Sequence, residues 1–312
     1  MATLKDVAAL AHVSKMTVSR ALNHPELVSA EIRQDVLAAV TALNYQPNRA
    51  GLALSKHKSF VFQFLMLEDV DQVEPYYGKL LIYISDALQQ SGYTLELGHS
   101  RQSLNPNVDG LIVVGARHHD LVWLKALDIP YVSYGEISED IPYVDVDNRL
   151  GTKIATQQLL MHGYTNIHYI GLTMDEYFAR QREQGYLDAT QVAHHLPHVH
   201  RITNNDRLAE TLVQQLALTP NMAFVCATDQ IGLGVVRGIL DAGFRIPEDV
   251  AVIGFDGVYL DQIASRRLTT IRQPLPQIAN ELIHLLEAQL TNRAWQPQLI
   301  VPELIVREST RN

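Results

Sequence analysis

The first 45 residues carry apolar side chains at the three- and four-residue spacing of amphipathic helices. A first helix is expected after Thr3, with Asp6 three residues on as its partner in a capping box. The expected inner face of this helix consists of Val7, Leu10 and Ala11. After a short turn at residues 12–13, Ser14 is expected to cap a second helix. The pattern predicts two short helices joined by a tight turn.

The second helix is expected to have one apolar and one polar face. Its inner side chains are Val18, Ala21 and Leu22, and its outer ones are Met16, Ser19, Arg20 and Asn23. A third helix, about residues 30–43, follows Ser29 and has a stripe of Ile32, Val36, Val40 and Leu43. Together the three helices predict a helix-turn-helix domain. A helical bundle without a DNA role is the alternative, but the hydrogen-bonding and basic outer face of the second helix favours DNA binding.

From residue 60 onward the pattern changes to apolar strands that alternate with amphipathic helices. The strands are FVFQFLML, YTLELG, VDGLIVVG, IPYVSYG, IHYIGLT, MAFVCAT and VAVIGFD, and the helices are expected at about residues 77–90, 149–162, 180–189 and 231–242. Such alternation predicts parallel sheets covered by helices. Because the units are too many for one sheet, we expect an α/β core of two doubly wound parallel-sheet subdomains with a cleft between them.

Ligands of doubly wound sheets bind beyond the carboxyl ends of the strands. The polar or aromatic residues that follow the predicted strands are Glu68, Asp69, Tyr134, Thr228, Asp229 and Asp256. We therefore expect them near a ligand, although a cap or surface role is open for each. Asp147, which precedes Asn148, is interpreted mainly as a helix cap.

Composition and charge refine this picture. The 312 residues are 47% hydrophobic and 19% charged, as expected for a globular chain of two or three domains. The formal net charge is −9, but residues 1–60 carry seven Lys or Arg against four Asp or Glu, so a basic module of +3 is joined to a body of −12. There is no signal-peptide stretch and no apolar run near the roughly 20 residues of a membrane span, so a cytoplasmic location is expected.

Catalytic and metal sites have little support in the sequence. We find no GxSxG elbow, P-loop, HExxH or CxxC pair, so neither an enzyme nor a cofactor is expected. The histidines His194, His195, His198 and His200 are interpreted as a solvated loop rather than a metal site, because Pro197 interrupts helical spacing. Cys226 lies in an apolar run, which favours a buried small side chain over the alternative of a catalytic thiol.

The segments TLKDVAALAHVSKMTVSRALN and LVSAEIRQDVLAAVTALNYQPNRAGLAL resemble the headpiece and hinge of the lactose-repressor (LacI/GalR) family. The resemblance implies that Lys15, Met16 and Arg20 face base edges, and that Thr17, Ser19 and Asn23 lie near phosphates. It adds Thr3, Ser14, Asn48 and Arg49 to the expected DNA-binding residues. Arg20 is the strongest candidate for base reading, because arginine suits guanine O6 and N7. Met16 can offer only apolar contact, for instance to a thymine methyl group.

Residues 47–54, PNRAGLAL, resemble the hinge helix of the family, which folds on the operator. By position, Leu54 is the leucine that enters the minor groove and kinks the duplex. Gly51 lowers the stability of an isolated helix by about 1 kcal/mol relative to alanine, which suits a segment that orders on binding. A plain linker is the alternative.

The resemblance covers essentially the whole chain and implies a core like a periplasmic sugar-binding protein. It implies an effector, with a sugar as the expected class, bound by Tyr76, Tyr77 and Arg182 together with the strand-end residues Asp69, Tyr134, Thr228, Asp229 and Asp256. Arg182 and Asp256 would form a donor and acceptor pair for vicinal hydroxyls. The chain departs from the family at residues 101–107, RQSLNPN, which are too short for the usual helical crossover, so a helix is expected to be missing there.

The expected domains are a headpiece (1–46), a hinge helix or linker (47–58) and an effector-binding and dimerisation domain (59–312). Within the last, subdomain 1 is expected at about 59–146 and 273–296, and subdomain 2 at about 147–272 and 297–312. The tail LIVPELIVREST matches the family's final strand without a leucine-heptad extension, so a homodimer is expected. The sequence therefore predicts a DNA-binding repressor that binds a palindromic operator. A ligand-binding module or transport receptor is the alternative, but it requires a secretion signal and no headpiece.

Overall fold

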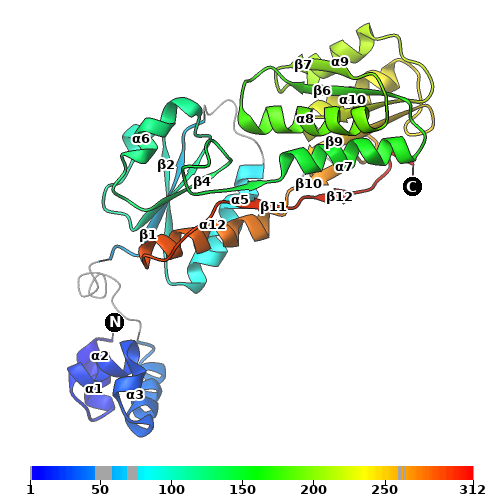
Figure 1. Ribbon diagram of the computed structural model, residues 1–312. Coiled ribbons are helices and arrows are strands. Elements are labelled where there is room, and N and C mark those ends of the chain that lie inside the picture. The colour runs from blue at the N-terminus through cyan, green and yellow to red at the C-terminus, as the bar shows by residue number, and fades with distance from the viewer. Residues whose placement is uncertain (1, 46–57, 69–75, 259–261, 263–264, 312) are drawn as a thin grey trace. The chain divides into compact units, whose positions relative to one another are not determined.

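The computed structural model describes residues 2–45, 58–68, 76–258, 262 and 265–311, and it divides into two units, residues 1–59 and 60–312 (Figure 1). The expected site residues Asn48, Arg49, Leu54 and Asp69 lie outside the described residues. Within the described chain, no helix is long and apolar enough to cross a membrane.

The first unit contains the three predicted helices. They are α1 (Leu4–Leu10), α2 (Lys15–Asn23) and α3 (Ala30–Ala42), with a 3₁₀ turn, η1 (Pro25–Leu27), between the last two. The side chains of Thr3, Ser14 and Ser29 accept hydrogen bonds from the backbone three residues on, which confirms the three caps. The turn between α1 and α2 is tight because His12 adopts a left-handed φ of 53°.

The core of this unit contains the apolar residues Val7, Ala8, Ala11, Val18, Ala21, Val36, Ala39 and Tyr45. The expected inner position of Leu10 is wrong, since its side chain is 48% exposed and Ala8 is buried instead. Ala8 of α1 and Ala11, its C-cap residue, are small and let the helices approach closely, which leaves the longer Leu10 on the outside.

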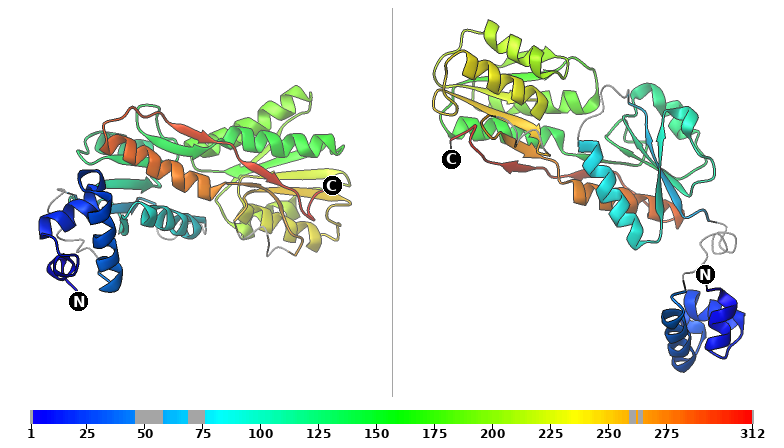
Figure 2. Two further views of the ribbon diagram at one scale, coloured as in Figure 1. Left: turned by 90° about the horizontal axis from the view of Figure 1, so that it is seen from below. Right: turned by 180° about the vertical axis from the view of Figure 1, so that it is seen from behind.

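The first sheet of the larger unit has the strand order β11-β5-β4-β3-β1-β2, all parallel. Its strands are β1 (Val61–Met66), β2 (Thr94–His99), β3 (Gly110–Val114), β4 (Tyr131–Tyr134), β5 (Tyr143–Val146) and β11 (Gln298–Ile300). Two adjacent helices, α5 (Tyr76–Gln90) and α12 (Leu275–Leu290), cover one face (Figure 2). The short α6 (Leu121–Lys125) packs on the other face.

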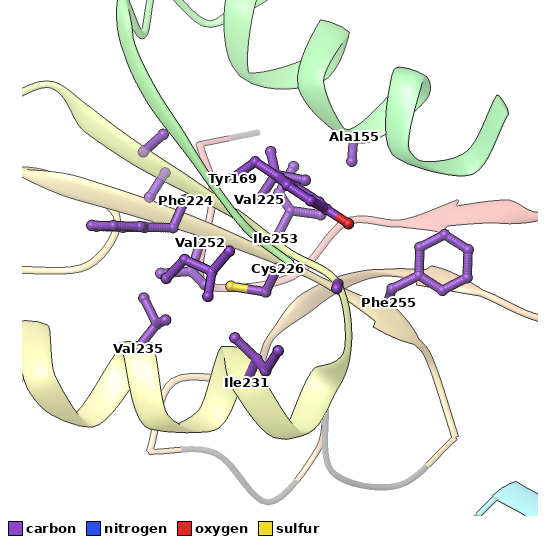
Figure 3. Close-up of a cluster of buried hydrophobic side chains, with 14 of the residues drawn as sticks. Ala155, Tyr169, Phe224, Val225, Cys226, Ile231, Val235, Val252, Ile253 and Phe255 are labelled. Carbon is purple, nitrogen blue, oxygen red and sulfur yellow. The ribbon is translucent and has the colours of Figure 1, made fainter. Parts of the chain in front are cut away.

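The second sheet has the order β12-β10-β9-β8-β6-β7, in which only the β10–β12 pair is antiparallel. Its strands are β6 (Asn166–Leu172), β7 (His198–Ile202), β8 (Met222–Cys226), β9 (Val250–Asp256), β10 (Thr269–Arg272) and β12 (Glu303–Ile305). Helices α7 (Asn148–Met161) and α8 (Tyr177–Val192) pack together, as do α9 (Asp206–Gln215) and α10 (Asp229–Asp241). Figure 3 shows Ala155 of α7 and Val235 of α10 on opposite sides of this sheet. Cys226 is buried in this core, where burial raises the pKa of its thiol.

The two doubly wound subdomains confirm the predicted fold class. The chain crosses between them after β5, after β10 and between β11 and β12. The expected boundary at residue 297 is wrong, because Gln298–Ile300 pairs with β5 of the first sheet and the last crossing lies at residues 301–302.

The missing crossover helix is confirmed. Between β2 and β3 the described chain has only a 3₁₀ turn, η3 (Arg101–Ser103). Gln63, a fully buried polar residue of β1, replaces part of the lost packing: its amide donates to Ser103 O at 2.8 Å and accepts from Asn105 N at 3.0 Å. These bonds hold the short connection against the sheet.

The solvated loop expected around the histidines is only partly right. Residues 198–202 form β7, the edge strand of the second sheet. The His198 and His200 rings stack on His168 of β6, with ring centroids 4.5 and 5.2 Å away. Burial, followed by the two neighbouring rings, lowers the pKa of His168 to about 4.

Candidate functional site

The outer face of α2 has the arrangement expected of a DNA-reading surface. Lys15, Met16 and Arg20 are exposed, Met16 by 64%. The start of α2 sets the positions of these side chains. The Ser14 hydroxyl accepts a hydrogen bond from Thr17 N at 3.1 Å, so the helix begins directly after Ser14. Apolar Val18 and Ala21 point into the core, so the long polar side chains are turned outward.

The other expected DNA-binding residues of the headpiece belong to the first two helices or cap them. Ser14 and Thr17 hydroxyls bond to each other at 2.8 Å, and Thr3 bonds to Asp6 in the capping box of α1. Thr17 and Ser19 are half-buried, and Asn23 is the last residue of α2. The structure thus assigns cap roles to Thr3 and Ser14, which place the N-termini of both helices.

The larger unit contains a cavity of about 730 Å³ lined by both subdomains. The helices that follow β6, β8 and β5 begin near it, as the rule for doubly wound sheets requires. Of the expected effector residues, Tyr76, Tyr77, Tyr134, Arg182, Thr228 and Asp256 line the cavity. Residues from far apart in the sequence thus converge on one site of a size typical for small ligands.

Three tyrosines of the first subdomain form one wall of the cavity. The rings of Tyr76 and Tyr77 lie 4.4 Å apart, and Tyr134 meets both edge-on at 6.2 and 6.5 Å. Burial raises the pKa of Tyr76 and Tyr134 well above the usual value, so their hydroxyls stay neutral donors. Such a wall offers both a stacking surface and hydroxyl groups.

Arg182, on α8, lines the cavity wall formed by the second subdomain and is only 5% exposed. Its Nε donates to Asn148 Oδ1 at 2.8 Å and its Nη1 donates to Ala227 O at 2.6 Å. The guanidinium lies 3.6 Å from the centre of the Phe255 ring, and Nη1 lies 3.6 Å from Asp256 Oδ1. These contacts fix the direction of the guanidinium group.

Asp256 connects this wall to the first subdomain. Its Oδ1 accepts from Gln273 Nε2 at 2.9 Å, and Gln273 Oε1 accepts from the Tyr134 hydroxyl at 2.6 Å. Burial raises the pKa of Asp256, and the charge of Arg182 opposes that shift. The expected pair of Arg182 and Asp256 thus exists in the cavity.

Asp229 does not line the cavity, in contrast to its expected role. Its Oδ1 accepts from the Thr270 hydroxyl at 2.7 Å and its Oδ2 accepts from Gly257 N at 2.8 Å. The carboxylate therefore joins α10 to the ends of β9 and β10. Thr228 caps α10 and also donates to Asn204 Oδ1 at 2.7 Å, while Asp147 caps α7 as interpreted from the sequence.

Sequence reasoning missed several polar residues of the cavity. They are Arg117, Glu136, Asp145, Asn148, Glu176, Asn204 and Gln273. Burial raises the pKa of Asp145 to about 6, although backbone donors at Glu136 and Val146 and the charge of Arg182 oppose the shift. The lining acids Glu68, Glu136, Asp145, Glu176 and Asp256 outnumber the arginines Arg117 and Arg182. Among the described lining residues, then, positive charge is in the minority.

Known proteins share both parts of this chain. A profile of bacterial regulatory proteins, lacI family, matches residues 3–48, and a periplasmic binding protein-like domain matches residues 156–310. The uncharacterized HTH-type transcriptional regulator YvdE of Bacillus subtilis (strain 168) is 43% identical over 316 residues, covering 99% of this chain and 100% of its own length. The HTH-type transcriptional regulator CelR of Thermobifida fusca is 30% identical, with 98% of each chain covered.

Solved structures agree with these relatives. A complex of the transcriptional regulator CelR with cellobiose has a TM-score of 0.69 and 28% identity, and covers 99% of this chain and 100% of its own. The lac repressor dimer bound to operator and the anti-inducer ONPF has a TM-score of 0.76 at 24% identity, with 99% of each chain covered, and this supports the fold. The relatives are transcriptional regulators rather than enzymes, and the identity to them extends along nearly the whole chain. The protein therefore belongs to the LacI family of bacterial regulatory proteins.

Proposed function

We propose that this protein is a repressor that binds a palindromic operator as a homodimer and responds to a neutral sugar bound in the cavity. The observation that carries the DNA-binding part is the outward face of α2, on which Lys15, Met16 and Arg20 are exposed from a capped helix. One headpiece reads one half-site, so a two-fold dimer requires a roughly palindromic operator. The hinge residues Asn48, Arg49 and Leu54 are proposed to add backbone and minor-groove contacts.

The composition of the cavity supports a neutral ligand with many hydroxyl groups. A ring can stack on Tyr76 or Tyr77, while Asp256 accepts and Arg182 donates hydrogen bonds. Both cavity arginines are already close to carboxylates, which disfavours a strongly anionic effector. A volume of about 730 Å³ offers room for more than one sugar ring.

The DNA-binding part is tested by selecting operators from random duplexes with the full chain and then comparing variants. Arg20→Ala is expected to lose about 1 to 3 kcal/mol of discrimination at one base pair, because arginine contacts two acceptors of guanine. Arg33→Ala removes the same charge from an exposed site on α3 and serves as the matched control. Leu54→Ala is expected to reduce DNA bending and specific affinity. Equal operator preference in Arg20→Ala and the wild type would overturn the assignment of α2.

The effector part is tested by a thermal-shift screen of neutral mono- and disaccharides, including cellobiose, against their phosphorylated counterparts. We expect a neutral saccharide to raise the melting temperature and to change operator affinity by about 5- to 150-fold, the range of a coupling of about 1 to 3 kcal/mol. Stabilisation by sugar phosphates alone would contradict the proposed ligand class.

A further inference from the structure

Arg117 connects the two subdomains of the larger unit beside the cavity. It follows β3 of the first subdomain, and its Nη1 donates a 2.5 Å hydrogen bond to Glu176 Oε1, at the start of α8 in the second. Its Nη2 lies 3.6 Å from Oε1 of Glu68, which follows β1. One guanidinium is thus shared by a carboxylate from each subdomain, and all three side chains line the cavity.

This ion pair is partly shielded from water. The side chains of Arg117 and Glu176 are 27% and 23% exposed, and that of Glu68 is 14% exposed. Burial by itself lowers the pKa of Arg117, but Glu176 and Glu68 raise it by more, so the guanidinium stays charged. Attraction between charges is stronger where water is partly excluded, so the pair favours the arrangement in which the subdomains are close.

A hydrogen bond connects this ion pair to the tyrosine wall. Glu68 Oε2 accepts from the Tyr77 hydroxyl at 3.0 Å, and the Tyr77 ring packs on Tyr76. Tyr77 thereby orients the carboxylate that Arg117 contacts. Any ligand that takes up the Tyr77 hydroxyl changes the partner of Glu68 and, through it, the surroundings of Arg117.

The backbone of Arg117 is held by Asp120, which in turn contacts the short connection that replaces the crossover helix. Arg117 N donates to Asp120 Oδ2 at 2.8 Å, and Asp120 is buried and paired with Arg101 of η3. The Arg101 guanidinium also lies over the Trp123 ring, 5.1 Å from its centre. The short connection between β2 and β3 therefore supports, through Arg101 and Asp120, the turn from which Arg117 projects.

We propose that Arg117 is a positioning residue: it holds the subdomains together across the cavity through Glu176, and Glu68 connects this contact to Tyr77. Its relevance to regulation rests on the proposed function, but the contact itself operates without ligand or DNA. The distance between the subdomains in the free protein should therefore depend on Arg117.

The experiment measures this distance by pulsed electron paramagnetic resonance in the full chain. Spin labels are attached through Val122→Cys in the first subdomain and Leu196→Cys in the second, since both side chains are 83% exposed. The natural Cys226 is 1% exposed and escapes labelling. An excess of unlabelled chain isolates distances within one protomer.

Arg117→Met and Glu176→Gln are each expected to raise the ratio of open to closed molecules about fivefold, the effect of one partly shielded ion pair. The double variant is expected to open no further than either single variant, because both remove one interaction. Arg117→Lys keeps the charge and should recover most of the closed population. Tyr77→Phe should open the protein by less, and should add nothing to Arg117→Met.

The matched control is Arg201→Met. Arg201 and Glu183 form an ion pair of the same 2.5 Å length, but both belong to the second subdomain, so the distance should stay as in the wild type. Unchanged distances in both Arg117→Met and Glu176→Gln, additive effects, or equal opening in Arg201→Met would overturn the proposal. An unchanged distance in Tyr77→Phe would overturn the connection through Glu68. Since no ligand or DNA is used, these outcomes are independent of whether a sugar binds.

Discussion

Replacing Arg182 by methionine should destabilise the larger unit by about 3 to 5 kcal/mol, the cost of leaving one partner of a buried ion pair alone. Methionine retains packing against Phe255 but removes the donors to Asn148 and Ala227 and the charge near Asp256. For a unit of this size each kcal/mol corresponds to about 2 to 4 °C, so the melting temperature should fall by about 10 °C.

The assay is urea unfolding monitored by circular dichroism. A variant of Asp256 tests whether the loss comes from leaving its charge without a partner. The double variant Arg182→Met/Asp256→Asn removes the isolated charge, so it should be more stable than Arg182→Met alone. Burial already raises the pKa of Asp256, and the opposing effect of Arg182 is lost in the variant. The folded variant therefore binds a proton at Asp256 more readily than the unfolded chain does, so its stability rises as the pH falls. The loss in Arg182→Met should therefore be smaller at pH 5 than at pH 8.

Arg201→Met again provides the control, because its guanidinium is 55% exposed and should contribute less than about 1 kcal/mol. A loss below about 1 kcal/mol in Arg182→Met would refute the reasoning, and so would a double variant whose loss equals the sum of both single losses.

Three further predictions concern packing, pH and assembly. Gly185→Ala should lower the free energy of unfolding by about 1 to 3 kcal/mol, because a Cβ would lie 2.1 Å from Arg149 O. Gly78→Ala has free space and should stabilise α5 by up to about 1 kcal/mol. Calorimetry of both variants tests the contrast. Between pH 6.5 and about 4, His168 takes up a proton in the unfolded chain but not in the folded one. The free energy of unfolding of the wild type should therefore fall by up to about 3 kcal/mol as the pH is lowered through this range, and that of His168→Phe should fall by less. Parallel pH profiles of the two proteins would contradict this. Light scattering of the full chain without DNA should give a dimer, and a monomer at micromolar concentration would argue against the proposed assembly.

Much of the fold could be predicted because its signals are local or periodic. Neighbouring residues alone determine the caps at Thr3 and Ser14. The same holds for the apolar runs that form the central strands of the sheets. Strand β7 was missed because an edge strand is only half covered, and its sequence HVHRI lacks an apolar run. Leu10 was misplaced because helical spacing does not decide which of two adjacent apolar faces packs inward.

The candidate site was predictable only as far as topology determines it. The strand-end rule identified Tyr134, Thr228 and Asp256, but it cannot tell which side chain turns back into the sheet, as Asp229 does. Arg117 and Glu176 are 59 residues apart, and only the relative placement of two subdomains brings them together. Arg182 was expected to contact ligand, yet its bonds to Asn148 and Ala227 also make it part of the framework.

The division of the tail between the two sheets has a consequence for proteolysis. β11 completes the first sheet, β12 completes the second, and the buried side chains of Ser309 and Thr310 anchor the residues after β12. Between the two strands, Val301 is 63% exposed. A protease that cuts there would leave both sheets with all their strands but would remove one of the three connections between the subdomains. The nicked protein should therefore migrate as a folded species on a native gel while its subdomains sample a wider range of angles.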